Sequence, residues 1–205
     1  MTRRLIAGVA ACALGLGGGC GAAADPAPEP AARLEAEPPA VAEPLPDLAL
    51  TLADGERSSL RAQLGEGRAL VIAYTSLACP VSRLYAPSWE ALRAGWAEQG
   101  VALLLVDPMQ VDDDAEVCAA AEELGWRAPV ARDPSGALTE ALDARRTTDV
   151  FLVDAALRVR YRGARDDQYG IGTRLAAPRR RYLEDALAAL LAGRPIEVAA
   201  TEAPG

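Results

Sequence analysis

The chain has 205 residues, and its 21 basic and 29 acidic side chains give a formal net charge of -8. This acidic balance disfavours nucleic acid as a partner, because phosphate binding needs clustered positive charge. The sequence contains no histidine, which excludes Cys-His nucleophile pairs, His-ligated metals and haem attachment of the C-x-x-C-H kind. We therefore expect no cofactor and no metal. The four cysteines are the candidates for chemistry.

The first twenty residues carry the pattern of a secretory signal. Two arginines precede a run of small and apolar residues that is shorter than the roughly 18–20 apolar residues of a membrane span. The run ends in LGLGGGC, which resembles a bacterial lipoprotein signal with Cys20 as the lipidated residue, although Leu16 lies one position too far upstream. The alternative is a plain signal peptide cut near residues 21–25. We expect residues 1–20 to direct export to the periplasm-facing cell envelope of a bacterium, with a lipid anchor in the membrane.

Residues 21–45 are rich in Pro, Ala and Glu and contain almost no large apolar side chain. Such a segment cannot bury enough surface to offset the entropy lost on ordering, so we expect a disordered linker. Behind a lipid anchor, this linker would hold a folded domain away from the membrane surface. We place that domain at residues 46–197 and treat residues 198–205 as a tail.

The domain alternates between strand patterns and helix patterns. Residues 45–64 predict a short strand, a turn at Asp54-Gly55 and a returning segment. Three continuous apolar runs have the length of strands buried on both faces of a sheet: 69–74, 101–106 and 150–154. Residues 158–163 alternate in period two after a turn, which predicts a hairpin with the run before them.

Helical periodicity follows each of these runs. Apolar residues at steps of three and four predict a helix over about 79–98, kinked at Pro87. Asp113 and Glu116 have the spacing of a capping box and predict the start of a second helix. A short helix and a last helix follow, the latter ending at Gly193. This order indicates one α/β domain with an antiparallel strand pair near its end.

The order of elements, with Cys-Pro after the first central strand, resembles the thioredoxin-like fold of the redoxin family. Four segments carry the resemblance and span most of residues 46–172: LPDLALTLADGERSSL, ALVIAYTSLACPVSRLYAP, ARDPSGALTEALDARRTTDVFLVD and RYRGARDDQYGIG. They look most like the peroxiredoxin branch, which contains alkyl hydroperoxide reductases and thiol-specific antioxidant proteins. The resemblance implies a central mixed β-sheet flanked by helices and a redox-active cysteine.

Cys79 stands at a strand-to-helix junction, where the helix dipole and unpaired N–H groups favour a thiolate. The residues expected to contact this thiol or its substrate are Thr75, Ser76, Pro80 and Ser82. The alternative is a structural cysteine, because cysteine is among the residue types most often buried. Buried cysteines ordinarily lie within a periodic apolar face, whereas Cys79 does not. We therefore expect a reactive thiol.

The peroxidase pattern is only partly present. In peroxiredoxins, Pro-x-x-x-Thr/Ser-x-x-Cys leads to the peroxidatic cysteine; here Ser76 fits the hydroxyl position and Ile72 replaces the proline. Those enzymes also place an arginine near the thiol, just before the strand that here begins around Val150. That position holds Thr148, and Arg146 lies two residues earlier. The resemblance thus suggests Thr148 and Arg146 as site residues without completing the peroxidase pattern.

The adjacent dithiol of thioredoxin-type exchange is also missing. The position three residues after Cys79 is Ser82, and the cis-proline of those enzymes would fall at Thr148, which could still offer its backbone to a substrate strand. Some atypical two-cysteine peroxiredoxins carry their resolving cysteine on the helix that here holds Cys118. The alternatives are that Cys118 is an unpaired helix cysteine and that an external thiol resolves the reaction.

The sequence therefore predicts an exported, membrane-tethered thiol-dependent oxidoreductase. Cys79 would attack a disulfide or a peroxide, and Cys118 or an external reductant would then restore the thiol. The alternative is a catalytically inactive thioredoxin-fold module for binding or assembly that retains Cys79 without turnover.

Overall fold

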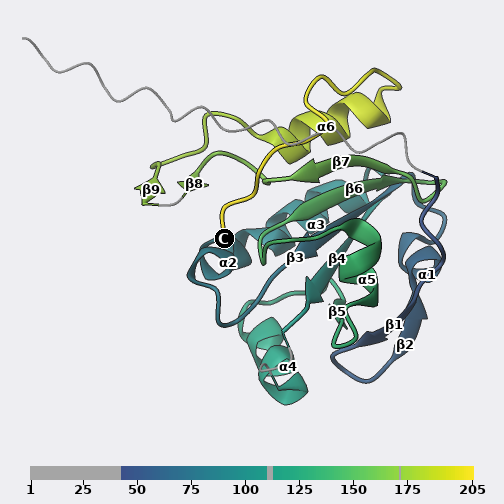
Figure 1. Cartoon of the computed structure of the whole chain (residues 1–205), viewed down its shortest axis with the longest axis vertical. Coiled ribbons are helices and arrows are strands. Elements are labelled where there is room, and N and C mark those ends of the chain that lie inside the picture. The colour runs from purple at the N-terminus through teal and green to yellow at the C-terminus, as the bar shows by residue number, and fades with distance from the viewer. Residues whose placement is uncertain (1–42, 110–112, 171) are drawn as a thin grey trace, which may run out of the picture. The chain divides into compact units, whose positions relative to one another are not determined.

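A computed structural model describes residues 43–109, 113–170 and 172–205. The expected signal, its lipidation site at Cys20 and all but the end of the expected linker lie outside these residues. Seven strands form one mixed sheet in the order β2-β1-β5-β4-β3-β6-β7, and β8 and β9 form a separate antiparallel pair (Figure 1). Within the described ranges, no helix is long and apolar enough to cross a membrane.

The central strands follow the apolar runs of the sequence. The bounds of the main sheet are β1 (Ala49–Leu52), β2 (Arg57–Ser59), β3 (Ala69–Tyr74), β4 (Val101–Asp107), β5 (Val130–Arg132), β6 (Val150–Asp154) and β7 (Val159–Gly163). β3, β4 and β5 run parallel, while β6 lies antiparallel to β3 and pairs with β7 as the expected hairpin. β1 and β2 form the other expected hairpin at the opposite edge.

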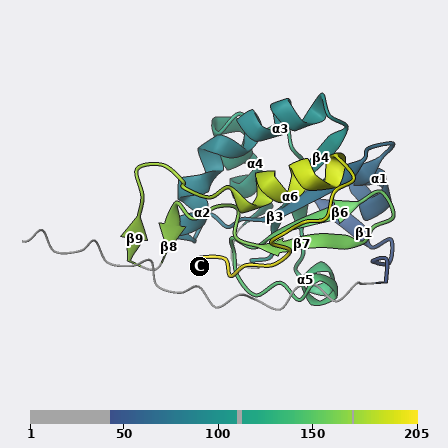
Figure 2. The ribbon, with the colours of Figure 1, turned by 90° about the horizontal axis from the view of Figure 1, so that it is seen from above.

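Helices cover both faces of this sheet, as Figure 2 shows from above. Successive residues of β3 point to opposite faces, so its odd-numbered residues join one apolar cluster and its even-numbered residues join another. α3 (Trp89–Ala97), α4 (Asp114–Glu123) and α6 (Tyr182–Leu191) contribute to the first cluster. α1 (Leu60–Leu64) and α5 (Ala137–Leu142) contribute to the second. Every residue of β3 is consequently buried.

The predicted kink at Pro87 is confirmed as a break between two helices. α2 (Pro80–Tyr85) is followed by a 3-10 turn, η1 (Ala86–Ser88), before α3 begins at Trp89. Proline lacks the N–H that would continue the α-helical pattern, so the helix changes direction there. The capping box is confirmed as well, because Asp113 Oδ1 accepts the N–H of Ala115 at 2.7 Å and Glu116 accepts the N–H of Asp113 at 3.3 Å.

The C-terminal half of the described chain adds two features outside the main layers. β8 (Tyr169–Gly170) and β9 (Thr173–Arg174) form their pair near α2, and the ring centroid of Tyr169 lies 4.8 Å from that of Tyr85. After α6, the chain turns at Gly193 (φ +66°) and returns along β7, where Ala200 pairs with Arg162 in parallel. Residues 198–205 therefore pack against the domain.

Candidate functional site around Cys79

Cys79 lies in the turn that joins β3 to α2. It is the N-cap residue of α2, and Pro80 takes the first helical position, where its missing N–H costs no hydrogen bond. Cys79 is half-buried, and its neighbours Ala78 and Pro80 are exposed. The thiol is therefore placed at a helix N-terminus with access to solvent.

The hydrogen bonds around Sγ favour its ionised form. The N–H of Ser82 donates to Sγ at an N-to-S distance of 3.5 Å, and the hydroxyl of Thr147 also bonds to the sulfur. Burial raises the pKa of the Cys79 thiol, but the donors from Thr147, Ser82 and Val81 outweigh burial and hold the pKa below its ordinary value. A thiol of lowered pKa contains more thiolate at neutral pH, and the thiolate is the nucleophile.

The loop before β6 reaches Cys79 because β6 runs antiparallel to β3. Ala73, near the end of β3, pairs with Val150 at the start of β6, so the residues after β3 and those before β6 meet at one edge of the sheet. The hydroxyl of Ser82 donates to the main-chain oxygen of Thr147 at 2.7 Å, which fixes the loop to the first turn of α2.

Asp149 holds this loop in shape. One oxygen of its buried carboxylate accepts the N–H groups of Arg145 and Arg146 at 2.7 and 2.9 Å. The main-chain oxygen of Asp149 accepts the N–H of Tyr74 at 2.9 Å, which connects the loop to the end of β3. Burial raises the pKa of Asp149 even though these two N–H donors act in the opposite direction. Asp149 thus positions the backbone that carries Thr147.

Thr75 and Ser76 lie buried in the turn that leads from β3 to Cys79. The N–H of Thr75 donates to the main-chain oxygen of Val106 at 2.8 Å. Ser76 Oγ accepts the N–H of Ala78 at 3.2 Å, and the main-chain oxygen of Ser76 accepts the N–H of Cys79 at 3.3 Å. These two residues shape the turn that presents the thiol.

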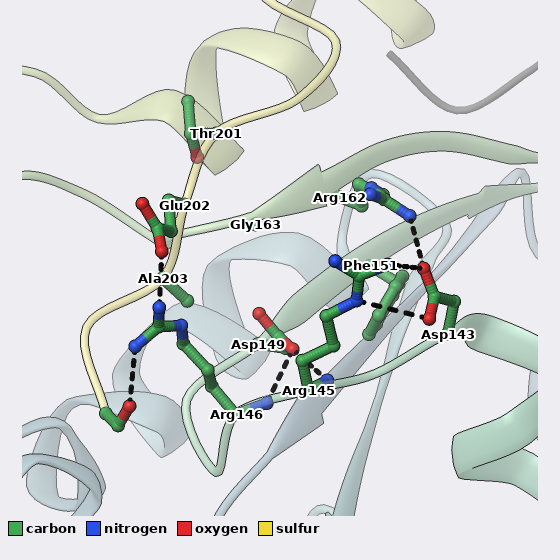
Figure 3. Close-up of a pocket in the computed structure, with 11 residues that line it drawn as sticks. Asp143, Arg145, Arg146, Asp149, Phe151, Arg162, Gly163, Thr201, Glu202 and Ala203 are labelled. Atoms are coloured by element: carbon green, nitrogen blue, oxygen red, sulfur yellow. Dashed lines mark hydrogen bonds and ion pairs between the residues drawn. The ribbon is translucent and has the colours of Figure 1, made fainter. Parts of the chain in front are cut away.

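Thr148 and Arg146 contact the C-terminal segment 202–205. The hydroxyl of Thr148 donates to the main-chain oxygen of Pro204, and Arg146 donates to the main-chain oxygen of Gly205 at 2.8 Å and pairs with Glu202. Figure 3 shows the contacts of Arg146 in a pocket of about 390 Å³ that Arg146, Glu202 and Gly205 help to line. Its other lining side chains include Asp143, Arg145, Phe151 and Arg162.

Cys118 lies on α4, as expected, and is half-buried. Cys79 and Cys118 are both free thiols and are not bonded to each other. The loop after α4 reaches the end of α2, where the indole N–H of Trp126 donates to the main-chain oxygen of Ala86 at 2.9 Å.

The comparisons with known proteins agree with this architecture. A family model described as Redoxin matches residues 40–173, which is more than half of the chain. The chain belongs to the Redoxin family. This confirms the predicted family and the thioredoxin-like fold with a central mixed sheet, and it supports an oxidoreductase kind of activity for this redoxin.

Solved structures show the same fold. A hypothetical protein from Sinorhizobium meliloti 1021 has a TM-score of 0.70 and 24% sequence identity, and the match covers 81% of this redoxin and 92% of that chain. An uncharacterized conserved protein from Geobacillus kaustophilus has a TM-score of 0.71 and 26% identity, with 80% and 88% covered. A thioredoxin-like protein from Aeropyrum pernix has a TM-score of 0.53 and 16% identity, with 72% and 89% covered. No curated protein matches the sequence significantly.

Sequence reasoning missed three parts of the site in this redoxin. Thr147, one residue before the expected Thr148, supplies the hydroxyl that bonds to Sγ. Asp149 shapes the loop. In the sequence it follows two threonines and directly precedes an apolar strand, and an acidic residue at that position was the available signal for a loop-shaping carboxylate. The third part is the contact of residues 202–205 with the loop, for which the sequence offered no periodic signal.

The end of α2 is fixed by a second, buried polar cluster. The hydroxyl of Tyr85 donates to Asp166 Oδ1 at 2.8 Å, and the side chain of Asp166 is fully buried. The guanidinium carbon of Arg165 lies 5.2 Å from the ring centroid of Tyr85 and 5.0 Å from that of Trp89, which is a cation–π arrangement. This cluster holds α2, and with it the turn at Cys79, against the body of the redoxin.

Proposed function

We propose that this redoxin is a thiol-dependent oxidoreductase in which Cys79 is the nucleophile, acting mainly in thiol–disulfide exchange. One observation carries the proposal: the half-buried thiol at the N-terminus of α2 has its pKa lowered by hydrogen bonds from Thr147 and Ser82. These two donors come from segments that are distant in sequence but share one edge of the sheet. A structural cysteine would need neither the donors nor the access to solvent.

The exchange follows from a thiolate at this position. The Cys79 thiolate attacks one sulfur of a disulfide, the S–S bond breaks, and the other sulfur leaves as a thiolate, so that Cys79 and the substrate share a mixed disulfide. A second thiolate then attacks Cys79 Sγ or the substrate sulfur. If Cys118 attacks Cys79 Sγ, a Cys79–Cys118 disulfide forms and the substrate leaves as a thiolate. If an external thiolate attacks the substrate sulfur, Cys79 leaves as a thiolate, and the substrate sulfur remains in a mixed disulfide with the external thiol.

Peroxide reduction is the less supported reaction for the same thiol. There, Sγ would take the distal oxygen of ROOH, giving a sulfenic acid and RO⁻, which takes up a proton. Catalysis of this step benefits from a cation that polarises the peroxide. Arg146, the arginine that the sequence suggested, pairs instead with Glu202 and the main-chain oxygen of Gly205. Ile72 also stands where peroxiredoxins have proline.

The proposal includes a location and partners. The signal pattern of residues 1–20 and the Pro-rich linker after it support export and a lipid anchor at Cys20 on the periplasm-facing membrane of a bacterium. A disulfide is the natural substrate class in that compartment, since it is an oxidising environment in which disulfides form and persist. An external reductant would have to return electrons to Cys79 or Cys118.

The test measures the reactivity of Cys79. Iodoacetamide alkylation of the full chain and of a Cys118→Ser variant is followed from pH 5 to pH 10, with the modified residue located by mass spectrometry. We expect a midpoint below the value of a free thiol, about 8.5, and a mixed disulfide at Cys79 after addition of a model disulfide. A midpoint at or above that value, without any adduct, would contradict the proposal and favour the inactive binding module.

The same experiment assigns the resolving thiol. If Cys118 resolves, the oxidised protein contains a Cys79–Cys118 peptide pair that disappears in the Cys118→Ser variant, and the mixed disulfide accumulates in that variant. If an external thiol resolves, the mixed disulfide has the same lifetime in both proteins.

A further inference from the structure

The segment after α6 packs along β7 and ends at the loop before β6. The N–H of Arg162 donates to the main-chain oxygen of Ala199 at 3.1 Å, and the N–H of Thr201 donates to the main-chain oxygen of Arg162 at 3.0 Å. The hydroxyl of Thr201 accepts the N–H of Ala164 at 2.9 Å. These contacts add the segment to the open edge of the sheet at the end of β7, and Figure 3 shows Thr201 and Glu202 passing close to Gly163.

Gly163 allows this close approach. Its φ of +129° is a conformation that other residues rarely adopt. A Cβ at this position would lie only 2.1 Å from the main-chain oxygen of Thr201. The glycine at the end of β7 is therefore required for the segment to cross the strand where it does.

The end of the segment covers the loop that touches Cys79. Ala203 and Pro204 are buried, although they lie near the end of the described chain. Thr148 and Arg146 donate to the main-chain oxygens of Pro204 and Gly205. A Cβ on Gly205 would lie 3.0 Å from Thr148 Oγ1 and 3.6 Å from Thr147 Oγ1. Gly205 therefore lies next to Thr147, whose hydroxyl bonds to Cys79 Sγ.

A small disulfide and a polypeptide disulfide differ in how much of the surface around Cys79 they must contact. A small disulfide needs only to reach Sγ, and Cys79 can be approached past the exposed Ala78 and Pro80. A polypeptide disulfide also brings the backbone on each side of its cysteine, which must lie against the surface next to the thiol. On the loop side, that surface at residues 146–148 is already occupied by residues 202–205.

We propose that residues 202–205 act as a specificity element that restricts Cys79 to low-molecular-weight disulfides by covering the 146–148 loop against polypeptide substrates. This inference rests on the proposed function. The segment holds its position through the ion pair of Glu202 with Arg146 and the two main-chain acceptors. The proposed role implies that a polypeptide can reach the thiol only in the fraction of molecules in which the segment is released.

The experiment compares two haloacetyl reagents on the full chain. One is iodoacetamide, and the other is an unstructured ten-residue peptide with a chloroacetyl group on a central side chain. The labelling rate at Cys79 is measured by mass spectrometry in three proteins. They are the parent, a variant that lacks residues 202–205, and a Glu202→Lys variant. Glu197→Lys is the matched control, because Glu197 is exposed on the same segment and lies before the pairing with β7.

We expect the ratio of the peptide rate to the iodoacetamide rate to rise about tenfold in the deletion variant, because several hydrogen bonds hold the segment closed. Glu202→Lys should raise the ratio by a smaller factor through repulsion from Arg146, and Glu197→Lys should leave it unchanged. Circular dichroism checks that each variant is folded; if the deletion variant is not, Glu202→Lys decides. A ratio within twofold of the parent, or a parallel rise of both rates, would overturn the inference.

Exchange with bis(2-hydroxyethyl) disulfide in the same variants reports on the proposed function separately. If neither a mixed disulfide at Cys79 nor a Cys79–Cys118 disulfide forms in any variant, the proposed function fails, whatever the ratio of labelling rates. If the small disulfide reacts but the ratio does not change, the proposed function stands and the specificity element is wrong.

Discussion

The hydroxyl of Ser82 donates to the main-chain oxygen of Thr147 at 2.7 Å, and this bond joins the first turn of α2 to the loop before β6. Ser82 stands where a dithiol motif would have its second cysteine, and it is 2% exposed. Its N–H also donates to Cys79 Sγ. Ser82 therefore positions both the thiol and the loop whose hydroxyl stabilises the thiolate.

Thr147→Val tests the hydroxyl contribution with little change in shape. The variant loses a hydrogen bond to the thiolate, so the pKa of Cys79 should rise, and iodoacetamide labelling at pH 7 should slow by roughly three- to tenfold. The rate above pH 10 should match the parent, because the thiol is then ionised in both proteins. Thr51→Val, on an exposed position of β1, is the control and should change neither value. An unchanged pH profile in Thr147→Val would remove this residue from the site.

Ser82→Cys should create the missing dithiol. Cys79 and residue 82 already approach each other across the first turn of α2, so the oxidised variant should contain a 79–82 disulfide. Loss of the bond to Thr147 should lower the free energy of unfolding of the reduced variant by about 1 kcal/mol. Ser82→Ala should show the same loss of stability without a bridge. Non-reducing peptide mapping and urea unfolding measure the two effects, and a variant that remains a free dithiol under oxidant would contradict the expected geometry.

Asp149 offers a comparison of two substitutions. Asp149→Asn keeps an oxygen that can accept both loop N–H groups, whereas Asp149→Ala removes the acceptor. We expect Asp149→Ala to lose about 1–3 kcal/mol of stability and to raise the pKa of Cys79 by releasing Thr147. Asp149→Asn should keep the Cys79 profile of the parent. Equal Cys79 profiles in Asp149→Ala and the parent would show that this carboxylate does not position the loop.

The raised pKa of Asp149 also determines a pH effect. In the native state the carboxyl takes up its proton at a higher pH than in the unfolded chain, so its contribution to stability falls as the pH rises from about 3.9 through the native pKa. Asp149→Asn cannot titrate. The parent should therefore lose stability relative to Asp149→Asn as the pH rises through this range.

Gly163→Ala should release the segment that crosses β7. The added Cβ would overlap the main-chain oxygen of Thr201, and amide hydrogen exchange at Thr201 should become faster. Gly125→Ala is the control, because Gly125 also has a positive φ but faces open space; it should cost about 1 kcal/mol of backbone strain and leave the exchange at Thr201 unchanged. Equal protection of Thr201 in both variants would mean that the segment does not depend on Gly163.

Much of the fold could be predicted because its signals are local. The apolar run 69–74 became β3 with the same bounds, and Pro87 broke the helix because its ring removes an N–H donor. The capping box at Asp113 depends on residues only three positions apart. Each of these patterns needs no knowledge of distant segments.

The site was harder to predict because it depends on register. Thr147 rather than Thr148 reaches Sγ, while Thr148 bonds to Pro204. The pairing of Ala73 with Val150 brings the loop before β6 to the thiol. Which of the two neighbouring threonines faces Sγ is then decided by the shape of this loop, which the bonds from Ser82 and to Asp149 fix. The segment at 202–205 has no apolar periodicity, and its place depends on Gly163, whose role appears only beside Thr201.

The thiolate of Cys79 should also stabilise the folded state in a definite pH range. Its native pKa lies below its ordinary value because the bonds from Thr147 and Ser82 outweigh burial. Between the native pKa and about 8.5, the unfolded chain holds more protons than the native state, so stability rises with pH. Above that range the contribution is complete, and it is lost as the pH falls through the native pKa.

Urea unfolding of the parent and of Cys79→Ser from pH 6 to pH 9.5 measures this contribution, because all other titrating groups are common to both proteins. The difference in the free energy of unfolding should grow in favour of the parent with rising pH and then become constant. The same comparison in a Thr147→Val background should show a smaller rise, since the native pKa then lies closer to that of the unfolded chain. A difference that stays flat, or that falls with pH, would mean that the fold does not stabilise a thiolate at Cys79.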